Sequence, residues 1–210
     1  VECQNNQLTS LILGQNKLLK KLNCAHNQLT QLNLNNMISL KDLNCFNNQL
    51  TVLDVSDSPK LTTLWLGDNH LTSLNLDNNP KLDFSLTDIY SGDNVYTVTL
   101  NPDRTFDLST LPGNFDKSRV TGWEHGKANG NILTVDEGTN VVYYGYQCRS
   151  NMLDVSFTLD VTGTGGTVPP VTPPSGGDNP GGGSTPGGST PGGTTPGGST
   201  GGGDGGGAIV

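Results

Sequence analysis

The chain has 210 residues and a formal net charge of −8, and only 11 residues are Lys or Arg. Nucleic acids and anionic lipids are held by clustered basic side chains, so these few scattered cations argue against both classes of partner. Hydrophobic residues make up 32% of the chain. This fraction is low because the residues after about 162 are almost entirely Gly, Thr, Ser and Pro, whereas the preceding residues contain enough apolar side chains for ordinary cores.

The first segment repeats with a period of 21 residues, and we call each period a coil. A fixed period in this range predicts a solenoid, in which each coil hides its apolar face by stacking on its neighbours. We expect this solenoid over residues 1–88, and we expect that Val1 begins inside a coil, because Cys3 already stands at a core position. The asparagine of each coil and the leucine two residues later are Asn6, Asn27, Asn48 and Asn69, with Leu8, Leu29, Leu50 and Leu71.

One coil illustrates the expected local structure. Leu43 and Cys45 alternate with polar residues, which is the pattern of a strand with one buried face. Asn48 stands at the bend, where its side-chain amide can pair with backbone groups that the turn leaves open, and stacked copies predict a buried ladder. Leu50–Val55 forms the second half, for which we expect a short strand or irregular backbone. Two extended pieces and two bends leave little room for a helix.

Three cysteines, Cys3, Cys24 and Cys45, share one coil position, where the next coil has Leu66. A leucine equivalent indicates an apolar site, so we expect reduced, buried thiols. A metal site would need further Cys or His at ligand spacing, which is missing, and a disulfide needs closer β-carbons than stacked coils offer. We therefore predict neither.

Two features lie on the outward side of the expected strands. Trp65 and Phe46 are large aromatics at positions where the other coils have small or polar residues, and aromatics are favoured anchors of interfaces. With Asn44, Asn23 and His26 beside them they form the candidate ligand-binding face. The alternative is that the two rings cover one another or lie under a neighbouring loop. On the opposite side, the corresponding row reads as merely solvated: Ile12, Asn33, Asp54 and Asn75.

The histidines give little support to catalysis. His26 and His70 replace Asn, Asp or Gln of other coils, which indicates surface variation. His125 follows Glu124 in an expected loop, and the pair could assist acid–base chemistry, but no nucleophile motif accompanies it. We expect no enzyme and no cofactor.

The densest group of oxygen-bearing side chains is Asp77, Asn78, Asn79 and Asp83. Calcium takes several oxygen ligands, so a bound ion is one interpretation. Asn-Asn-Pro is first of all a turn signal, and the spacing matches no calcium loop, so we favour a turn and expect no metal site.

Residues 89–162 lose the period and gain β-branched and aromatic residues. Strands are expected at 95–100 and 132–135, with a hairpin of 141–147 and 153–161, and Asn129-Gly130 predicts a tight turn. Short strands at this density indicate a small antiparallel β-sandwich, immunoglobulin-like, that caps the open end of the repeats. Cys148 is expected in its core.

Trp123 and the run Tyr143–Tyr146 leave two interpretations open. They could form platforms on which sugars stack. Alternating tyrosines in a strand more often pack a core on one face, and this is the simpler reading.

Residues 163–210 form the last part, in which Ser184-Thr185-Pro186-Gly187-Gly188 recurs as a unit. Such a segment lacks the apolar side chains that offset the entropy of ordering, so it predicts a disordered linker. Its last residues, 207–210, turn apolar. We expect a membrane-spanning or wall-anchoring segment in the parent chain, although a truncated end remains an alternative reading.

The repeats also carry a resemblance to a known family. Leu19-Lys20-Lys21-Leu22-Asn23-Cys24-Ala25-His26-Asn27-Gln28-Leu29, and again residues 40–50, resemble the 21-residue bacterial leucine-rich repeat in its cysteine-ladder form, as in internalin J-like surface proteins. The resemblance covers residues 1 to about 86 and decays after Leu82. It implies an extracellular protein on a bacterial cell surface that binds host or neighbouring macromolecules.

From these observations we expect a non-enzymatic binding or adhesion module whose repeat strand face holds an extracellular protein or glycan. The alternative is a carbohydrate-binding or spacer module of a larger surface or glycan-processing protein, in which the site would lie near Trp123.

Overall fold

The computed structural model describes residues 1–85, 94–150, 153–162 and 208–209. Within these ranges the regular structure consists of strands and two 3₁₀ helices of three residues each, so the prediction of a mainly β protein is confirmed. No helix in these ranges is long and apolar enough to cross a membrane.

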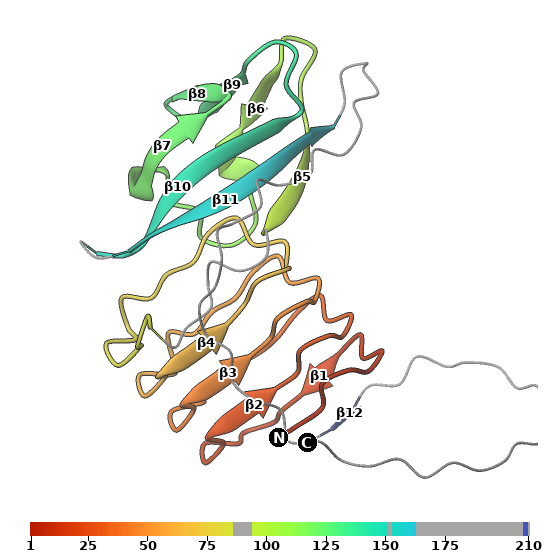
Figure 1. The fold of residues 1–210 in the computed structure, drawn as a ribbon, viewed down its shortest axis with the longest axis vertical. Coiled ribbons are helices and arrows are strands. Elements are labelled where there is room, and N and C mark those ends of the chain that lie inside the picture. Colours follow the sequence, from red (N-terminus) through yellow and green to blue (C-terminus); the bar gives the residue numbers. More distant parts are fainter. Residues whose placement is uncertain (86–93, 151–152, 163–207, 210) are drawn as a thin grey trace, which may run out of the picture. The chain divides into compact units, whose positions relative to one another are not determined.

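The coils pair through one short strand each (Figure 1). These strands are β2 (Lys21–Asn23), β3 (Asp42–Asn44) and β4 (Thr63–Trp65), and they form a parallel sheet in the order β2-β3-β4. The register advances by one period, so that equivalent residues of successive coils are partners. In each strand the central leucine is buried and the residue after it is half-buried, which is the alternation that a strand with one buried face requires.

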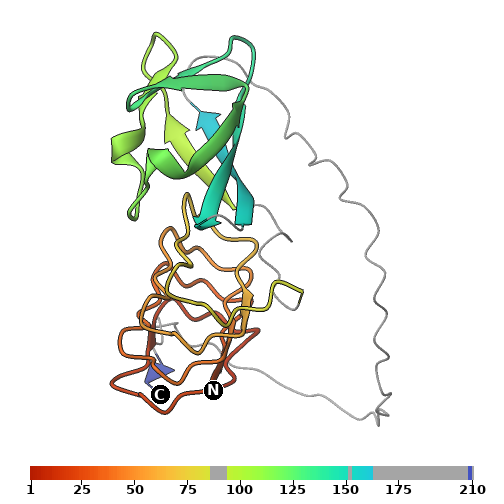
Figure 2. The same cartoon turned by 90° about the vertical axis from the view of Figure 1, so that its left-hand side faces the viewer.

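The opposite side of the coils is mostly irregular, and Figure 2 shows the successive turns stacked in sequence order. Its one strand is β1 (Leu11–Ile12). The apolar residues of this side still point inward, because Leu32, Leu53 and Leu74 occupy one buried row. Repetition of the apolar positions therefore fills a continuous core even where the backbone forms no ladder.

Buried asparagines join each coil to the one before it. The Nδ2 of Asn48 donates to the carbonyls of Cys45 and Phe46 in its own coil, and to that of Cys24 in the preceding coil, at 3.1, 3.4 and 3.1 Å. Its Oδ1 accepts from the Leu29 amide at 3.0 Å. Asn27 and Asn69 make the equivalent bonds. One side chain thus bonds to one backbone amide and to carbonyls of two coils, at a bend that lies inside the molecule.

The second part of the chain forms two sheets (Figure 1). One has the order β5-β11-β10-β7 and the other the order β6-β9-β8. The strands and 3₁₀ helices in chain order are β5 (Val95–Thr99), β6 (Thr105–Asp107), η1 (Leu108–Thr110), η2 (Lys117–Arg119), β7 (Val120–Glu124), β8 (Gly126–Asn129), β9 (Ile132–Val135), β10 (Val141–Arg149) and β11 (Leu153–Thr162).

The predicted strands are present, and Asn129-Gly130 joins β8 to β9 with Gly130 at φ 61°. The prediction of an antiparallel arrangement is wrong at one pair, since β5 and β11 are parallel. Parallel strands need a long crossover, which the more than fifty residues between β5 and β11 supply. The strands β6, β7 and β8 were not predicted, because they are short and contain Gly, Asp and Asn.

The asparagine contacts continue into the second part of the chain. Oδ1 of Asn94, the residue before β5, accepts from the Leu71 amide at 3.2 Å, as the coil asparagines do for Leu8, Leu29 and Leu50. Asn94 is buried, and its own carbonyl accepts from Thr158 of β11. A side-chain oxygen from outside the repeat therefore accepts the hydrogen bond of the last coil's Leu71 amide.

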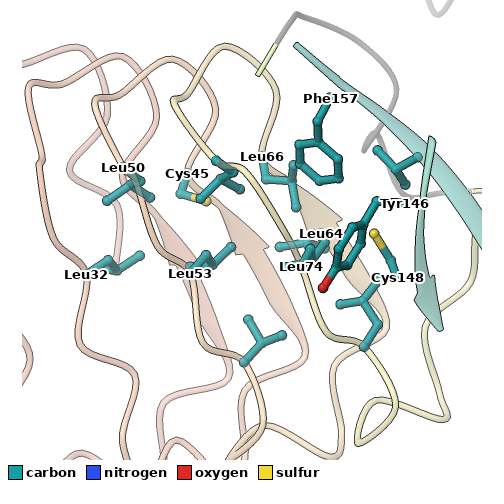
Figure 3. Close-up of a cluster of buried hydrophobic side chains, with 14 of the residues drawn as sticks. Leu32, Cys45, Leu50, Leu53, Leu64, Leu66, Leu74, Tyr146, Cys148 and Phe157 are labelled. Carbon is teal, nitrogen blue, oxygen red and sulfur yellow. The ribbon is translucent and has the colours of Figure 1, made fainter. Parts of the chain in front are cut away.

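Apolar side chains of β10 and β11 pack on the last coil. Figure 3 shows Tyr146, Cys148 and Phe157 beside Leu64, Leu66 and Leu74, and all six side chains are buried in one cluster. Within this contact the buried Tyr144 hydroxyl donates to the Thr72 carbonyl at 2.6 Å, and the Leu76 amide donates to the Cys148 carbonyl at 2.8 Å. The expected burial of Cys148 is confirmed, and its neighbours include residues of the repeat.

Asp77 closes the edge of this contact. Its carboxylate forms an ion pair with Arg119 and accepts from the amide and hydroxyl of Ser150 at 2.8 and 2.9 Å. The hydrogen bond from Arg119 is the main cause that lowers the pKa of Asp77, and burial opposes it weakly.

The predicted boundary at residues 88 and 89 lies outside the described residues, as do residues 163–207 and Val210 of the predicted linker. Ala208–Ile209 forms β12, which pairs in parallel with β1. The expected linker therefore stays a prediction.

Replacing Asn48 by Ala should lower the free energy of unfolding by about 2–4 kcal/mol, because it leaves the buried Leu29 amide without a partner and removes one of two side-chain donors from the carbonyls of Cys24 and Cys45. Denaturant titration would measure the change. The matched control is Asn6→Ala: Asn6 has the same place in its coil, but is exposed and donates only to Cys3 and Gln4. We expect a loss below about 1 kcal/mol there. Equal losses in the two variants would contradict the role given to burial.

Asp77→Asn should lower stability by about 1 kcal/mol at pH 7, because a partly exposed ion pair contributes little more. The folded pKa of Asp77 is lowered, so its contribution is complete above the ordinary pKa of an aspartate and disappears as pH falls through the folded value. The two proteins should therefore become equally stable once the pH lies below the folded pKa of Asp77. Thermal melts at decreasing pH would show it, with Asp136→Asn as the control for loss of an exposed charge. A difference that persists in acid would overturn the assignment.

Candidate functional site

The outward side of β2, β3 and β4 brings the candidate residues into rows. Asn23, Asn44 and Trp65 are register partners, and Glu2 bridges to Asn23, so the four form one row across neighbouring coils. Strands that pair in this way lie about 4.8 Å apart. Trp65 stands at the end of the row and is half-buried. A single large ring therefore ends a row of polar side chains.

Phe46 belongs to the next row, between Ala25 and Gly67, which are both buried. Phe46 is half-buried, and its ring meets His26 edge-on, with centroids 5.4 Å apart and an interplanar angle of 67°. No ring contact joins it to Trp65 within the described residues. The two aromatics do not cover one another, and both keep part of their surface open.

The asparagines of the face are held in place by their own strands. Asn23 Oδ1 accepts from the Ala25 amide at 3.3 Å, and Asn44 Oδ1 accepts from the Phe46 amide at 3.1 Å. These bonds use the acceptor of each side chain. The amide NH₂ groups have no acceptor among the described residues, so they are donors that a ligand could use.

His26 has a backbone role that the sequence interpretation missed. It has φ 53°, and the equivalent residues Asn5, Asn47 and Asp68 have φ between 51° and 58°. Asn, Asp and His are the non-glycine residues that most readily adopt this left-handed conformation. The position is therefore constrained to a few residue types and is not free surface variation. The restriction to Asn, Asp and His at 21-residue spacing was the signal that could have revealed it.

A charged row next to the candidate face was also missed. Lys21 and Asp42 form an ion pair at 2.9 Å, and the Thr63 hydroxyl donates to Asp42 at 2.6 Å. Burial opposes ionisation of Asp42, but the hydrogen bonds from Thr63 and Lys21 outweigh it and lower the pKa of Asp42. The sequence contained the signal for this row, because Lys21, Asp42 and Thr63 are spaced 21 residues apart and so occupy the same position in three successive coils.

The cysteines lie directly behind the face. Cys24 and Cys45 are fully buried free thiols that donate to the carbonyls of Asn44 and Trp65 at 3.5 and 3.4 Å. Burial raises the pKa of Cys24 to about 12, so the reactive thiolate is scarce at neutral pH. Cys3, in the first coil, is only half-buried, which differs from the expectation of burial because no earlier described coil covers it. No group of metal-ligating side chains occurs in the described ranges.

The remaining histidines have different surroundings. His70 Nδ1 lies 2.8 Å from the carbonyl of Val95, the first residue of β5. The expectation of mere surface variation is wrong here, because the ring contacts the chain beyond the repeat. His125 is exposed, lies between β7 and β8, and has its Nε2 3.6 Å from Glu124. In the described part of the chain, the His125 ring contacts Glu124 and the ring of Tyr143, and neither is a catalytic nucleophile of the kind that an acid–base pair activates.

The oxygen-bearing cluster is dispersed by the fold. Asp77 contacts Arg119 and Ser150, whereas Asn79 is buried and donates to the carbonyls of Val55 and Ser58 at 2.9 Å each. Asp83 accepts from Ser85. These side chains serve separate local contacts, as the turn interpretation expects.

The tyrosine run divides between two faces of β10. Tyr144 and Tyr146 are buried, whereas Tyr143 is half-buried on the other side. Trp123 is half-buried and packs on Tyr144 with centroids 5.0 Å apart. A hollow of about 260 Å³ is lined by Trp123, Tyr143 and Glu124 among others. Most of the run is core, and only Trp123 and Tyr143 offer surface to a ligand.

No family model matches the chain, and a search of curated proteins found no match. Among solved structures, one described as the functional domain of InlJ from Listeria monocytogenes, which includes a cysteine ladder, is 18% identical with a TM-score of 0.27. The similar region covers 77% of this chain and 61% of that chain.

Proposed function

We propose that this chain is a non-enzymatic binding module that holds an extracellular protein through the outward face of β2, β3 and β4. The observation that carries the proposal is the presence of Trp65 and Phe46 on that face, half-buried and with no ring contact between them. Aromatic side chains with open surface next to polar groups are typical anchors of protein interfaces.

We infer that residues 1–85 form a leucine-rich-repeat solenoid of the bacterial 21-residue type, and that residues 94–162 form an immunoglobulin-like domain that caps it. The 21-residue register of β2, β3 and β4 and the buried asparagines support the first inference. The contacts of Asn94 and Tyr144 with the last coil support the second. An open solenoid end exposes apolar side chains, and a cap removes them from water.

The geometry of the face is suited to recognition without catalysis. Paired strands and Asx-type bonds hold its side chains in place, so little conformational entropy is lost when a partner binds. The face has the Lys21–Asp42 ion pair at one margin and the side-chain amide donors of Asn23 and Asn44 in the middle. Because hydrogen bonds depend on direction, these groups would fix the orientation of a bound partner. We expect the partner to offer an apolar patch that receives the two aromatic rings of the face, with hydrogen-bond acceptors around the patch. No cofactor enters this mechanism.

The cysteine-bearing repeat pattern resembles that of bacterial surface proteins, so we place the protein outside the cell on a bacterial surface. The net charge of −8 favours a partner that is not polyanionic.

A second candidate function rests on the hollow beside Trp123 and Tyr143. The half-buried ring of Tyr143 lies beside its register partner Glu124. An aromatic ring next to a carboxylate suits a sugar, whose C–H groups stack while its hydroxyls form hydrogen bonds. In this alternative the second domain binds a glycan and the repeats act as a spacer.

Binding of residues 1–165 should be screened on combined glycan and extracellular-protein arrays, with Trp65→Ala and Phe46→Ala tested singly and together. We expect protein partners, with affinity lowered about tenfold or more by each change, since truncation of an interface anchor costs about 2 kcal/mol. Ile12→Ala is the matched control, because Ile12 is an exposed apolar residue on the irregular side.

Three results separate the two functions. A partner lost in the double variant but kept by Ile12→Ala supports the strand face. A glycan that survives the double variant and is lost with Trp123→Ala supports the second domain. A protein partner that is retained by all of these variants contradicts both placements.

A further inference from the structure

A separate cavity of about 430 Å³ lies on the irregular side of the repeats, away from the strand face. One wall comes from the third and fourth coils, at residues 52–56 and 73–78. The other comes from residues 113–119 and Tyr146 of the second part of the chain. Its volume falls in the range of about 300–1,000 Å³ that is usual for small-molecule sites.

The coil wall carries polar groups with unused hydrogen-bonding capacity. Asp54 Oδ1 accepts from the Ser56 amide, and Asn75 Oδ1 accepts from the Asp77 amide, both at 2.9 Å. The second carboxylate oxygen of Asp54 and the NH₂ group of Asn75 have no partner among the described residues. The same holds for the hydroxyl of Ser73. This wall therefore offers acceptors and donors side by side.

The facing wall has the same mixture and is fixed in position. The Tyr146 hydroxyl accepts from the Asp116 amide at 3.1 Å, which leaves its hydrogen free to donate. The Asn114 side chain is exposed and has no partner in the described ranges. Arg119 donates to the Gln147 carbonyl at 3.1 Å and pairs with Asp77, and this holds the loop against the last coil.

The lining is partly apolar, and its facing wall includes one glycine. Val52 of the coil wall is 43% exposed. Gly113 has φ 74°, and a Cβ there would lie 3.6 Å from Val52 and from the Ser73 hydroxyl. Gly113 supplies a left-handed conformation that side chains disfavour, and so the loop can approach the coils closely. Apolar surface together with a few hydrogen-bonding groups is the usual composition of a ligand pocket.

The charges of the lining decide the ligand class. Asp54 and Asp116 are acidic, and the one cation of the lining, Arg119, is already paired with Asp77. An anion would meet two carboxylates and no available positive charge. We propose that this cavity binds a neutral saccharide, because sugar hydroxyls both donate and accept while their C–H faces lie on apolar surface. The site is independent of the strand face and of the hollow beside Trp123.

The test is titration of the full chain with a panel of neutral monosaccharides and disaccharides, including glucose, galactose, mannose and N-acetylglucosamine, followed by NMR. We expect at least one sugar to bind, and Asp54→Ala to weaken it about tenfold, since it removes a charged acceptor. Asn33→Ala is the matched control. Asn33 has the same place one coil earlier and the same bond to the amide two residues on, at 2.9 Å, but lies outside the cavity.

The outcomes are distinct. Binding that Asp54→Ala weakens and Asn33→Ala leaves unchanged supports the site, provided that both variants melt as the parent does. Binding that Asp54→Ala and Asn114→Ala leave intact but Trp123→Ala abolishes places the sugar elsewhere and overturns the proposal. Lack of binding by every sugar at millimolar concentration also overturns it, as does a preference for charged amines over neutral sugars.

Discussion

The buried asparagine side chain is the interaction on which the rest of the structure depends. A turn that folds back into the interior leaves backbone amides and carbonyls without water, and each unpaired group would cost about 1–3 kcal/mol. Asn48 accepts from one of these amides and donates to carbonyls of two coils, and so links them. The strands of the coils are only three residues long. Backbone bonds beyond the strands, such as that from the His26 amide to the Phe46 carbonyl, and the asparagine side chains extend the bonding between coils.

The same constraint explains how the repeat ends. The last coil needs an acceptor for its Leu71 amide, and Asn94 supplies one although it stands outside the 21-residue period. Tyr144 meets the carbonyl of Thr72 in the same way. Around these polar bonds, Phe157, Tyr146 and Cys148 continue the apolar core of the coils (Figure 3). The second part of the chain therefore supplies hydrogen-bond partners and apolar contacts to the last coil. The loop that carries Gly113 and Arg119 is held by this contact and forms one wall of the proposed saccharide cavity.

The two candidate sites on the repeats could be predicted from the sequence to different extents. Trp65 and Phe46 were identified from the sequence because a period of 21 residues makes any departure from small polar residues visible. The left-handed backbone of His26 was equally present in the repeat, as Asn, Asp and His at one position, but was interpreted as variation. By contrast, Asp54 and Asn75 were interpreted as solvated residues, and only the loop folded over them makes them part of a cavity. The 21-residue period predicts which residues of neighbouring coils lie side by side, but it does not predict contacts with residues outside the repeat.

The sequence by itself determined the coil period, the inward-facing leucines, the buried cysteine position and the strands expected at 95–100, 132–135, 141–147 and 153–161, since all of these depend on local alternation and turn chemistry. Tertiary structure alone decided the parallel pairing of β5 with β11, the use of Asn94 by the last coil, and the capture of Asp77 by Arg119 and Ser150. These contacts join residues between 23 and 73 positions apart. No periodic pattern encodes such pairs, because they form only when two separately patterned segments pack against each other and their exposed polar groups must find partners.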